Sequence, residues 1–397
     1  MRTVGVTGTN GKTTTTWLCA ALLAETSPHV AMVTTLGSFL GGVRIEVPAG
    51  FDGLLATMRA CEEKGGNFAA IEYTSEALAR GVAKHWPADI AVFTNLSHDH
   101  QDAHPSFEHY LASKAQLFVH LKEGGAAVLN ACDENAALID EVVPPGRSKI
   151  HYGLASRGKP WRALDLTADD VSFDWSGTDF TLAKSALVSN ACKIHVNAIG
   201  AIFAENALAA IGAGLAAGIS LDAIARRLET APIPAGRFEV VARDSHVVVD
   251  YAHSPDALAR TLATARTLSR AKVTVVFGAG GNRDSKKRPL LGDAAKIADR
   301  VIVTNDNPRD EEPEAIAAAI REGLRAHPNV ETILDRASAI ESAIADAKEN
   351  DVVVIAGKGH ESVQIHGRRA ESFSDRDVAT ATCLRMKRGN SPRTPNG

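Results

Sequence analysis

The stretch Val4-Gly5-Val6-Thr7-Gly8-Thr9-Asn10-Gly11-Lys12-Thr13-Thr14 decides the fold, because a short apolar run breaks into a glycine turn there. We expect a strand, a loop and a helix in that order. Such a turn lets backbone N–H groups converge on an anion, and the helix directs its positive end at it. Lys12 adds a point charge, and Thr13 offers a hydroxyl to Mg²⁺. The stretch therefore predicts a phosphate cradle made by Gly8, Thr9, Asn10, Gly11, Lys12, Thr13 and Thr14.

The cradle departs from the strict G-x-x-x-x-G-K-[ST] pattern, because the residue five before Gly11 is Val6. The alternative interpretation is an ordinary glycine turn ahead of a helix. Two features favour the cradle: an apolar strand precedes the turn, and four threonines at 13–16 lead into a helical run at 17–23.

Length and composition limit the classes of function. At 397 residues the chain exceeds one ordinary core, so two domains are expected. A net charge of −4 without a basic block argues against nucleic acid or a membrane surface as partner. The five cysteines form no C-x-x-C pair, which indicates reduced thiols. The sequence shows neither a signal-peptide pattern nor an apolar run of membrane-spanning length, so we expect a cytoplasmic protein.

The first part of the chain alternates strands with helices, which predicts a parallel sheet covered on both faces with ligands at the carboxyl ends of its strands. The further expected strands are 30–35, 68–73, 90–95 and 126–130. From 149 to 196 short alternating runs predict an antiparallel extension, and an alanine-rich helix follows at 201–217.

A segment with two prolines and a glycine, 231–236, is the candidate linker. A second α/β series follows it, with strands expected at 246–250, 272–277, 300–304 and 351–356 and helices at 256–268, 290–298, 313–326 and 337–347. The predicted fold is therefore α/β: a P-loop-type doubly wound central domain, 1–232, and a second Rossmann-like domain, 233–386. The polar tail 387–397 is expected to be disordered.

Polar side chains gather after the strands of the first domain. Glu72 ends one strand, where a carboxylate can complete a Mg²⁺ shell, although a solvated glutamate is the alternative. The loop at 94–104 holds three histidines and two aspartates, which indicates a metal or acid–base site or, alternatively, a surface loop. Lys114 lies in an expected helix whose apolar side faces the core. If it points inward, it must lose its charge or gain a partner. The alternative, which is the usual one for a lone lysine, is a solvated helix face.

Three strand ends of the second domain carry polar groups in the same way. Gly278-Ala279-Gly280-Gly281-Asn282-Arg283-Asp284 lets the backbone and Arg283 approach an anion, Asp306-Asn307-Pro308-Arg309 combines a guanidinium with a carboxylate, and Gly357-Lys358-Gly359-His360-Glu361 follows the last strand. Such groups suit an amino acid that carries both charges.

With these residues in view, the chain resembles the Mur ligase family, most closely its MurE type, from about residue 4 to residue 379. The motifs that carry the resemblance are T-G-T-N-G-K-T-T at 7–14, T-N-L-S-x-D-H-x-D-x-H at 94–104, G-R-F-E at 236–239, D-Y-A-H-S-P-D-A-L at 250–258, N-R-D-x-x-K-R-P-L at 282–290, D-N-P-R at 306–309 and G-K-G-H-E at 357–361.

The resemblance implies an ATP-dependent acid–amino-acid ligase of peptidoglycan precursor synthesis. ATP phosphorylates a carboxylate, and an amine attacks the acyl phosphate. Lys12, His100 and Lys114 are implied to be catalytic, and two Mg²⁺ ions are implied, one on Thr13 and Glu72 and one on His100 with a carbamylated Lys114. For the nucleotide the implied contacts are Asn206 with adenine, Asp250 with ribose and Arg237 with the γ-phosphate. The implied amino-acid pocket consists of Arg283, Asp306, Asn307, Arg309, Gly357 and Glu361, and D-N-P-R is the form found with meso-diaminopimelate.

The chain departs from the family on the acceptor side. Only three residues precede the first strand where the family has a uridine-nucleotide domain, Glu76 replaces a histidine, and the family's T-T-P reads Glu46-Val47-Pro48. A separate departure lies in the linker-proximal helix, where Phe203 replaces an asparagine although Asn206 remains. We therefore expect a small-molecule carboxylate acceptor without the usual UDP group, or an acceptor supplied by another protein. The alternatives to a ligase are a non-catalytic ATP-binding subunit and a P-loop NTPase regulator.

Overall fold

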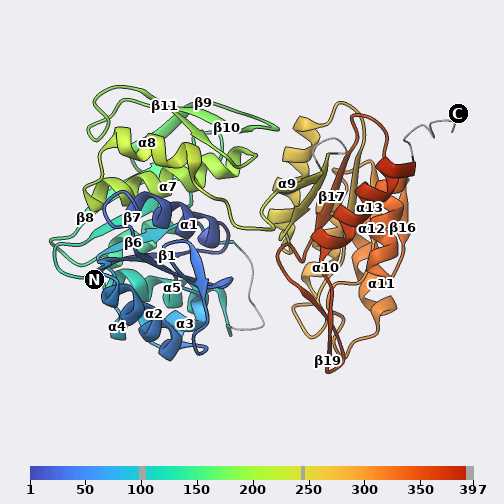
Figure 1. Cartoon of the computed structure of the whole chain (residues 1–397), viewed down its shortest axis with the longest axis horizontal. Coiled ribbons are helices and arrows are strands. Elements are labelled where there is room, and N and C mark those ends of the chain that lie inside the picture. The colour runs from blue at the N-terminus through green and yellow to red at the C-terminus, as the bar shows by residue number, and fades with distance from the viewer. Residues whose placement is uncertain (98–103, 243–245, 390–397) are drawn as a thin grey trace, which may run out of the picture. The chain divides into compact units, whose positions relative to one another are not determined.

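The computed structural model describes residues 1–97, 104–242 and 246–389 (Figure 1). The chain divides into two compact units, Met1–Pro234 and Ala235–Gly397. Each unit is a mainly parallel sheet with helices on both faces, which confirms the predicted α/β fold class. Among the described residues, no helix is both long enough and apolar enough to cross a bilayer.

The sheet of the first unit runs in the order β11-β10-β9-β8-β7-β6-β1-β5-β2-β3-β4 within the described part of the chain. Its strands are β1 (Arg2–Thr7), β2 (Val30–Thr34), β3 (Gly37–Leu40), β4 (Val43–Ile45), β5 (Phe68–Glu72), β6 (Ile90–Phe93), β7 (Ala126–Asn130), β8 (Ser148–Gly153), β9 (Leu166–Asp174), β10 (Gly177–Leu182) and β11 (Cys192–Val196).

The central strands of this sheet are apolar runs buried on both faces, as expected for parallel strands covered by helices. β1 lies between β5 and β6, with Val6 opposite Glu72 and Thr7 opposite Phe93. The loops after these three strands therefore leave the sheet at the same edge.

Helices cover both faces of this sheet. Figure 1 shows α1, α7 and α8 on one face and α2, α3, α4 and α5 on the other. The helices are α1 (Lys12–Leu23), α2 (Phe51–Glu63), α3 (Ser75–Ala79), α4 (Val82–His85), α5 (Phe107–Val119), α6 (Ala136–Val142), α7 (Ala201–Ala217) and α8 (Leu221–Thr230).

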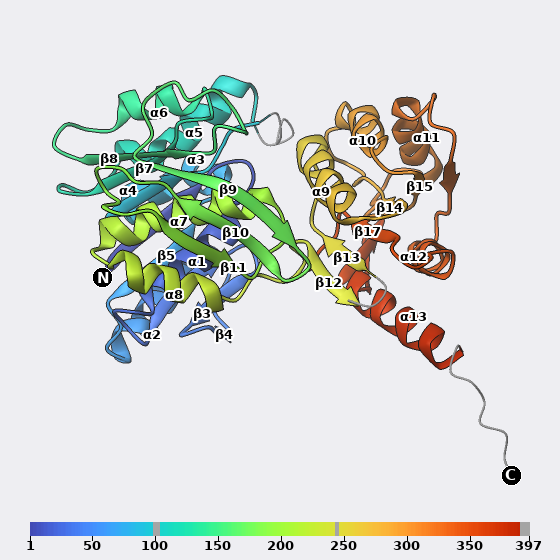
Figure 2. The same ribbon diagram turned by 90° about the horizontal axis from the view of Figure 1, so that it is seen from above.

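The second unit has a sheet in the order β12-β13-β17-β14-β15-β16. Figure 2 shows α9, α10 and α11 on one face of this sheet and α12 and α13 on the other. The strands are β12 (Glu239–Ala242), β13 (Val247–Asp250), β14 (Val273–Phe277), β15 (Arg300–Val303), β16 (Val330–Thr332) and β17 (Val352–Ala356), with a separate hairpin of β18 (Val363–His366) and β19 (Arg369–Ser372). The helices are α9 (Pro255–Leu268), α10 (Lys287–Ala295), α11 (Pro313–Gly323), α12 (Arg336–Ala345) and α13 (Asp375–Gly389).

Several elements differ from the sequence-based expectations. β3 and β4 add two antiparallel strands after β2, and α10 begins at Lys287, three residues before the expected start. The antiparallel extension holds for β9 to β11, whereas β8 pairs in parallel with β7. The expected disorder of 387–397 is wrong for 387–389, because α13 continues to Gly389. Residues 390–397 lie outside the described part of the chain.

Candidate active site

The turn after β1 contains two glycines at positions where neighbouring side chains lie very close to the backbone. Gly8 and Gly11 have φ values of 149° and 82°, which disfavour L side chains. A Cβ on Gly8 would collide with the Thr94 hydroxyl, and a Cβ on Gly11 would collide with the Asn206 amide oxygen. Asn206, the predicted adenine contact, therefore lies directly against the turn.

Hydrogen bonds from the end of β6 fix the shape of this loop. The Thr9 amide donates to the Asn95 carbonyl at 2.7 Å, and the Asn10 amide donates to Asn95 Oδ1 at 3.0 Å. Thr94 Oγ1 donates to the Asn10 carbonyl at 2.7 Å. On the opposite side, Thr9 Oγ1 lies 3.0 Å from the Tyr110 hydroxyl. The loop is thus held in shape by its neighbours, which lowers the cost of ordering it around an anion.

Helix α1 begins at Lys12, directly after the turn, so its positive N-terminal end is part of the site. Lys12 Nζ donates to the Thr9 carbonyl at 2.8 Å and lies over the loop. Thr13 and Thr14 are buried in the first turn of the helix. The loop, the lysine and the helix end therefore lie together, and phosphate binding at this turn stays a prediction.

A hard-oxygen site adjoins the cradle at the end of β5. Thr13 Oγ1 donates to Glu72 Oε2 at 3.0 Å, and the Thr35 amide donates to the same oxygen at 3.2 Å. A hydroxyl and a carboxylate suit Mg²⁺, so this pair fits the implied ion. No group of three or more His, Cys, Asp or Glu side chains with metal-binding geometry occurs within the described ranges. Phosphate oxygens and water would therefore have to complete the shell.

Lys114 points into the core and is 1% exposed, so it does not lie on a solvated helix face. Its Nζ donates to the Gly8 carbonyl at 2.7 Å and lies 4.3 Å from the centre of the Tyr110 ring. The lysine has thus gained partners at the cradle. Its implied companion in the second metal site, His100, lies outside the described residues.

His104, at the end of the predicted histidine-rich loop, is buried beside α3 and α5. Its Nε2 lies 2.8 Å from Ser75 Oγ, and its Nδ1 lies 2.9 Å from His109 Nδ1. Since one imidazole nitrogen must donate in the second contact, the tautomers of the two histidines are coupled.

In the second unit, Asp250 ends β13 and is buried. Its carboxylate accepts hydrogen bonds from the Phe238 amide at 2.6 Å, the Ala252 amide at 2.9 Å and Thr261 Oγ1 at 2.9 Å. Burial raises the pKa of Asp250, although these donors oppose the effect. Arg237 precedes β12, and its guanidinium lies 4.5 Å from the centre of the Tyr251 ring.

The loops after β15 and β17 meet around a buried lysine. Lys358 Nζ is fully buried and donates to Asn307 Oδ1 at 3.1 Å and to Glu361 Oε2 at 3.0 Å, with Asp306 Oδ1 at 3.7 Å. Asn307 Nδ2 also donates to Glu361 Oε2 at 3.0 Å. The structure therefore brings Asp306, Asn307 and Glu361 together. The side-chain amide of Asn307 already makes hydrogen bonds to Lys358 and Glu361.

The loop after β14 brings the two predicted arginines together. A Cβ on Gly280 would lie 3.0 Å from Arg309 Nη1 and 3.4 Å from Arg283 Cγ. Arg309 Nη1 donates to the Gly281 carbonyl at 2.8 Å. Gly357, the remaining predicted residue of this pocket, follows β17, and its amide donates to the Asp250 carbonyl at 3.1 Å.

Arg309 has a φ of 53°, unusual for a residue with a side chain. The β18–β19 hairpin holds its backbone there. The Arg309 amide donates to the Ile365 carbonyl at 3.1 Å, and the Gly367 amide donates to the Arg309 carbonyl at 2.7 Å. The hairpin therefore fixes the backbone from which the guanidinium extends.

The residues that depart from the family pattern lie in different surroundings. Phe203 is buried in α7, whereas Glu76 is exposed in α3. Glu46 is 93% exposed and lies 3.8 Å from Arg44. The acceptor-side changes thus include two solvent-facing carboxylates.

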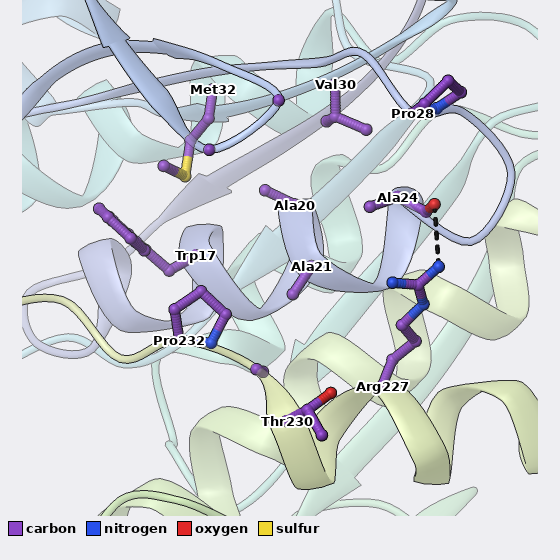
Figure 3. A pocket seen from close by; sticks show the side chains of 13 residues that line it. Trp17, Ala20, Ala21, Ala24, Pro28, Val30, Met32, Arg227, Thr230 and Pro232 are labelled. Carbon is purple, nitrogen blue, oxygen red and sulfur yellow. Dashed lines mark hydrogen bonds between the residues drawn. The ribbon is translucent and has the colours of Figure 1, made fainter.

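A separate cavity of about 210 Å³ in the first unit lies beside α1 (Figure 3). It is mostly apolar, with Trp17 at one end and Arg227, which donates to the Ala24 carbonyl at 3.2 Å, at the other. None of the predicted site residues lines it.

Sequence reasoning missed three residues that support the two sites. Thr35 follows β2 and shares Glu72 with Thr13, and Asn95 braces the cradle. Lys358 is buried between the amino-acid loops. Thr35 and Asn95 end predicted strands and Lys358 follows one, so a search for polar residues at all strand ends could have found them.

Comparisons with known proteins agree with this geometry. The family model "Mur ligase middle domain" matches residues 6–214, and "Mur ligase, glutamate ligase domain" matches residues 236–359. The UDP-N-acetylmuramoyl-L-alanyl-D-glutamate–2,6-diaminopimelate ligase of Syntrophomonas wolfei is 39% identical over 399 residues, which are 98% of this chain and 79% of that protein.

Solved structures agree as well. A ligase with the same printed name is 32% identical with a TM-score of 0.66, covering 98% of this chain and 79% of its own. The folylpolyglutamate synthase of Mycobacterium tuberculosis shares the fold, with a TM-score of 0.71 at 20% identity over 99% of this chain and 92% of its own.

Fold, cradle and relatives define the class: this is an ATP-dependent enzyme that joins an acid to an amino acid. Mg²⁺ is typical of such ligases. Within that class, the chain belongs to the Mur ligase family.

Proposed function

We propose that this ligase adds meso-diaminopimelate to a peptidoglycan-precursor carboxylate. The observation that carries the proposal is the arrangement of Arg283 and Arg309 around Gly280. Arg309 also donates to the carbonyl of Asn307, whose side chain binds the carboxylate of Glu361. Guanidinium groups suit the carboxylates of the amino acid, and the acidic side chains suit its ammonium groups. The 39% identity to a 2,6-diaminopimelate ligase supports the same amine.

The reaction has two steps. A carboxylate oxygen of the acceptor takes the γ-phosphoryl group of ATP, releasing ADP. The amine then attacks the acyl carbon, an amide bond forms, and phosphate leaves as the amine loses a proton. Lys12 and the N-terminus of α1 would stabilise charge on the transferring group.

Thr13 and Glu72 would hold one Mg²⁺, which neutralises phosphate charge when bound. A second ion on His100 and a carbamylated Lys114 completes the proposal. The support for this second ion is that Lys114 is buried at the carbonyl of Gly8. A carbamate on this lysine would replace its positive charge by a negative group that can bind a metal ion. We place the reaction in the cytoplasm, where ATP is available.

The acceptor is proposed to be UDP-N-acetylmuramoyl-L-alanyl-D-glutamate or a related carboxylate. The exposed Glu46 and Glu76 favour the related carboxylate, because added negative charge repels an anionic nucleotide. An acceptor presented by a separate protein is a further form of this second candidate.

The experiment measures ADP release with each acceptor and a panel of meso-diaminopimelate, L-lysine, L-alanine and D-glutamate. Release that depends on both meso-diaminopimelate and the UDP-dipeptide supports the first candidate. Lys12→Ala is the control for background hydrolysis.

Release that depends on meso-diaminopimelate but only with a simpler peptide carboxylate supports the second candidate. Release that is indifferent to amine and acceptor would contradict both.

A further inference from the structure

The second unit contains a fully buried ion pair behind the amino-acid loops. The side chains of Arg336 and Asp375 are both 0% exposed. Arg336 Nε donates to Asp375 Oδ1 at 2.7 Å, and Arg336 Nη2 donates to Asp375 Oδ2 at 2.8 Å, so the pair is bidentate.

The same guanidinium reaches two strand ends. Arg336 Nη1 donates to the Asn305 carbonyl at 3.0 Å, and Nη2 donates to the Ala356 carbonyl at 2.9 Å. Asn305 immediately precedes the loop 306–309, and Ala356 immediately precedes the loop 357–361. Since β14 lies between β15 and β17 in the sheet, one side chain spans the ends of two strands that are not neighbours.

Burial lowers the pKa of the Arg336 guanidinium, whereas the negative charge and the hydrogen bonds of Asp375 raise it. The net effect is a raised pKa. Asp306 and Glu361 act in the same direction. The group is therefore a permanent cation beneath the amino-acid site.

Stability alone is a weak reason for such a pair, because well-packed apolar residues of similar volume are often as stabilising as a buried ion pair. Apolar side chains would, however, leave the Asn305 and Ala356 carbonyls without these donors. The distinctive contribution of the pair is geometric.

We propose that Arg336, oriented by Asp375, is a positioning residue that sets the separation of the loops 306–309 and 357–361 and hence the shape of the amino-acid pocket. This inference rests on the proposed function for the identity of the amine. It assigns Arg336 and Asp375 no contact with substrate.

Arg336→Lys tests the proposal, because a single ammonium nitrogen cannot span Asp375 and both carbonyls. Arg300→Lys is the matched control. Arg300 is 14% exposed and binds Glu331 through Nε at 2.8 Å and Nη2 at 3.1 Å, but it begins β15 at the opposite end from Asn305.

The first readout is steady-state ADP release with meso-diaminopimelate. We expect Arg336→Lys to raise KM for the amino acid about tenfold and to change KM for ATP less than about twofold. Arg300→Lys should change neither by more than about twofold. Equal increases for both substrates in Arg336→Lys, or the same selective increase in Arg300→Lys, would overturn the proposal.

The second readout needs no turnover. Amide hydrogen exchange at Asn305 and Gly357, whose N–H groups donate to Leu334 and Asp250, should accelerate about tenfold in Arg336→Lys and stay near wild type in Arg300→Lys. Unchanged exchange in Arg336→Lys overturns the proposal. If Arg336→Lys does not fold, Asp375→Asn, which keeps the shape and loses the charge, replaces it with the same expectations.

The two failures are distinguishable. If the wild-type protein releases no ADP in response to any amine, the proposed function fails. The exchange comparison still decides whether the guanidinium positions the loops.

Discussion

Thr13 Oγ1 donates to Glu72 Oε2 at 3.0 Å, which joins the first turn of α1 to the end of β5. The two residues are 59 positions apart in the chain and meet only because β1 and β5 are parallel neighbours. This contact joins a hydroxyl to a carboxylate beside the glycine turn, where we propose a Mg²⁺ ion.

Glu72→Gln keeps an acceptor for Thr13 but removes the charge that Mg²⁺ prefers. We expect ADP release to fall by a factor on the order of 10² and half-saturation by Mg²⁺ to require higher concentrations. A Mg²⁺ titration of ligation measures both. Glu62→Gln, an exposed glutamate in α2, is the control and should match wild type. An unchanged Mg²⁺ dependence in Glu72→Gln would remove this residue from the metal site.

Lys114→Met replaces a buried cation by an apolar chain of similar length. We expect loss of activity by a factor on the order of 10² or more, because the group at the Gly8 carbonyl is lost. If the lysine is carbamylated, wild-type activity should also fall in CO₂-depleted buffer and return with bicarbonate. Full activity of Lys114→Met would contradict both the role of Lys114 at the Gly8 carbonyl and its role as a carbamylated metal ligand. The variant should also unfold at a temperature near that of the wild type, which excludes misfolding as the cause of any loss.

Arg309→Ala removes the guanidinium beside Arg283 and Gly280. We expect KM for meso-diaminopimelate to rise about tenfold or more, since a charge-assisted contact contributes roughly 1.5–3 kcal/mol, while KM for ATP stays near wild type. Competition between meso-diaminopimelate and L-lysine in one assay measures the change in preference. Arg321→Ala, on α11, serves as the control. Equal loss for both amines would show that Arg309 does not select between them.

His360 carries a pH-dependent contribution to the stability of the second unit. Burial, aided by Arg237, lowers the pKa of His360 to about 4. The unfolded chain therefore binds a proton that the native state does not, between about pH 6.5 and pH 4. Stability should fall as pH decreases through this window, by an amount on the order of 1 kcal/mol after allowance for partial exposure. Urea unfolding at pH 7.5 and pH 5 checks this.

The matched variant is His360→Asn, which does not titrate. Its stability difference between the two pH values should be smaller than that of the wild-type protein. An equal difference in the two proteins would assign the pH dependence to other groups.

Buried runs such as those of β6 and β17 are apolar over their whole length, so the sequence was sufficient to predict the parallel sheets. The glycine turn and the start of α1 were also predictable, because the residues from Gly8 to Thr14 are contiguous in the sequence. Contacts between distant segments were harder. The short β3 and β4 carry no long apolar run, and the β18–β19 hairpin is largely exposed, so periodicity gave no signal for either.

The partners of the buried residues Lys358 and Arg336 could not be predicted from the sequence either. Lys358 stands beside two glycines, and the local sequence does not indicate that its ammonium is buried between Asn307 and Glu361. Arg336 lies 39 positions from Asp375, and their pairing depends on how α12 and α13 pack. Such partners follow from tertiary packing, which a local pattern does not specify.

The hairpin that holds Arg309 has a consequence for reading relatives of this enzyme. Ile365 in β18 accepts a hydrogen bond from the Arg309 amide, and Gly367 in the hairpin turn donates one to the Arg309 carbonyl, yet both lie more than fifty positions downstream of the D-N-P-R motif. A lengthened or shortened hairpin would redirect the arginine without altering the motif. Two proteins with identical D-N-P-R segments can therefore prefer different amines, and a specificity assignment needs the hairpin as well as the motif.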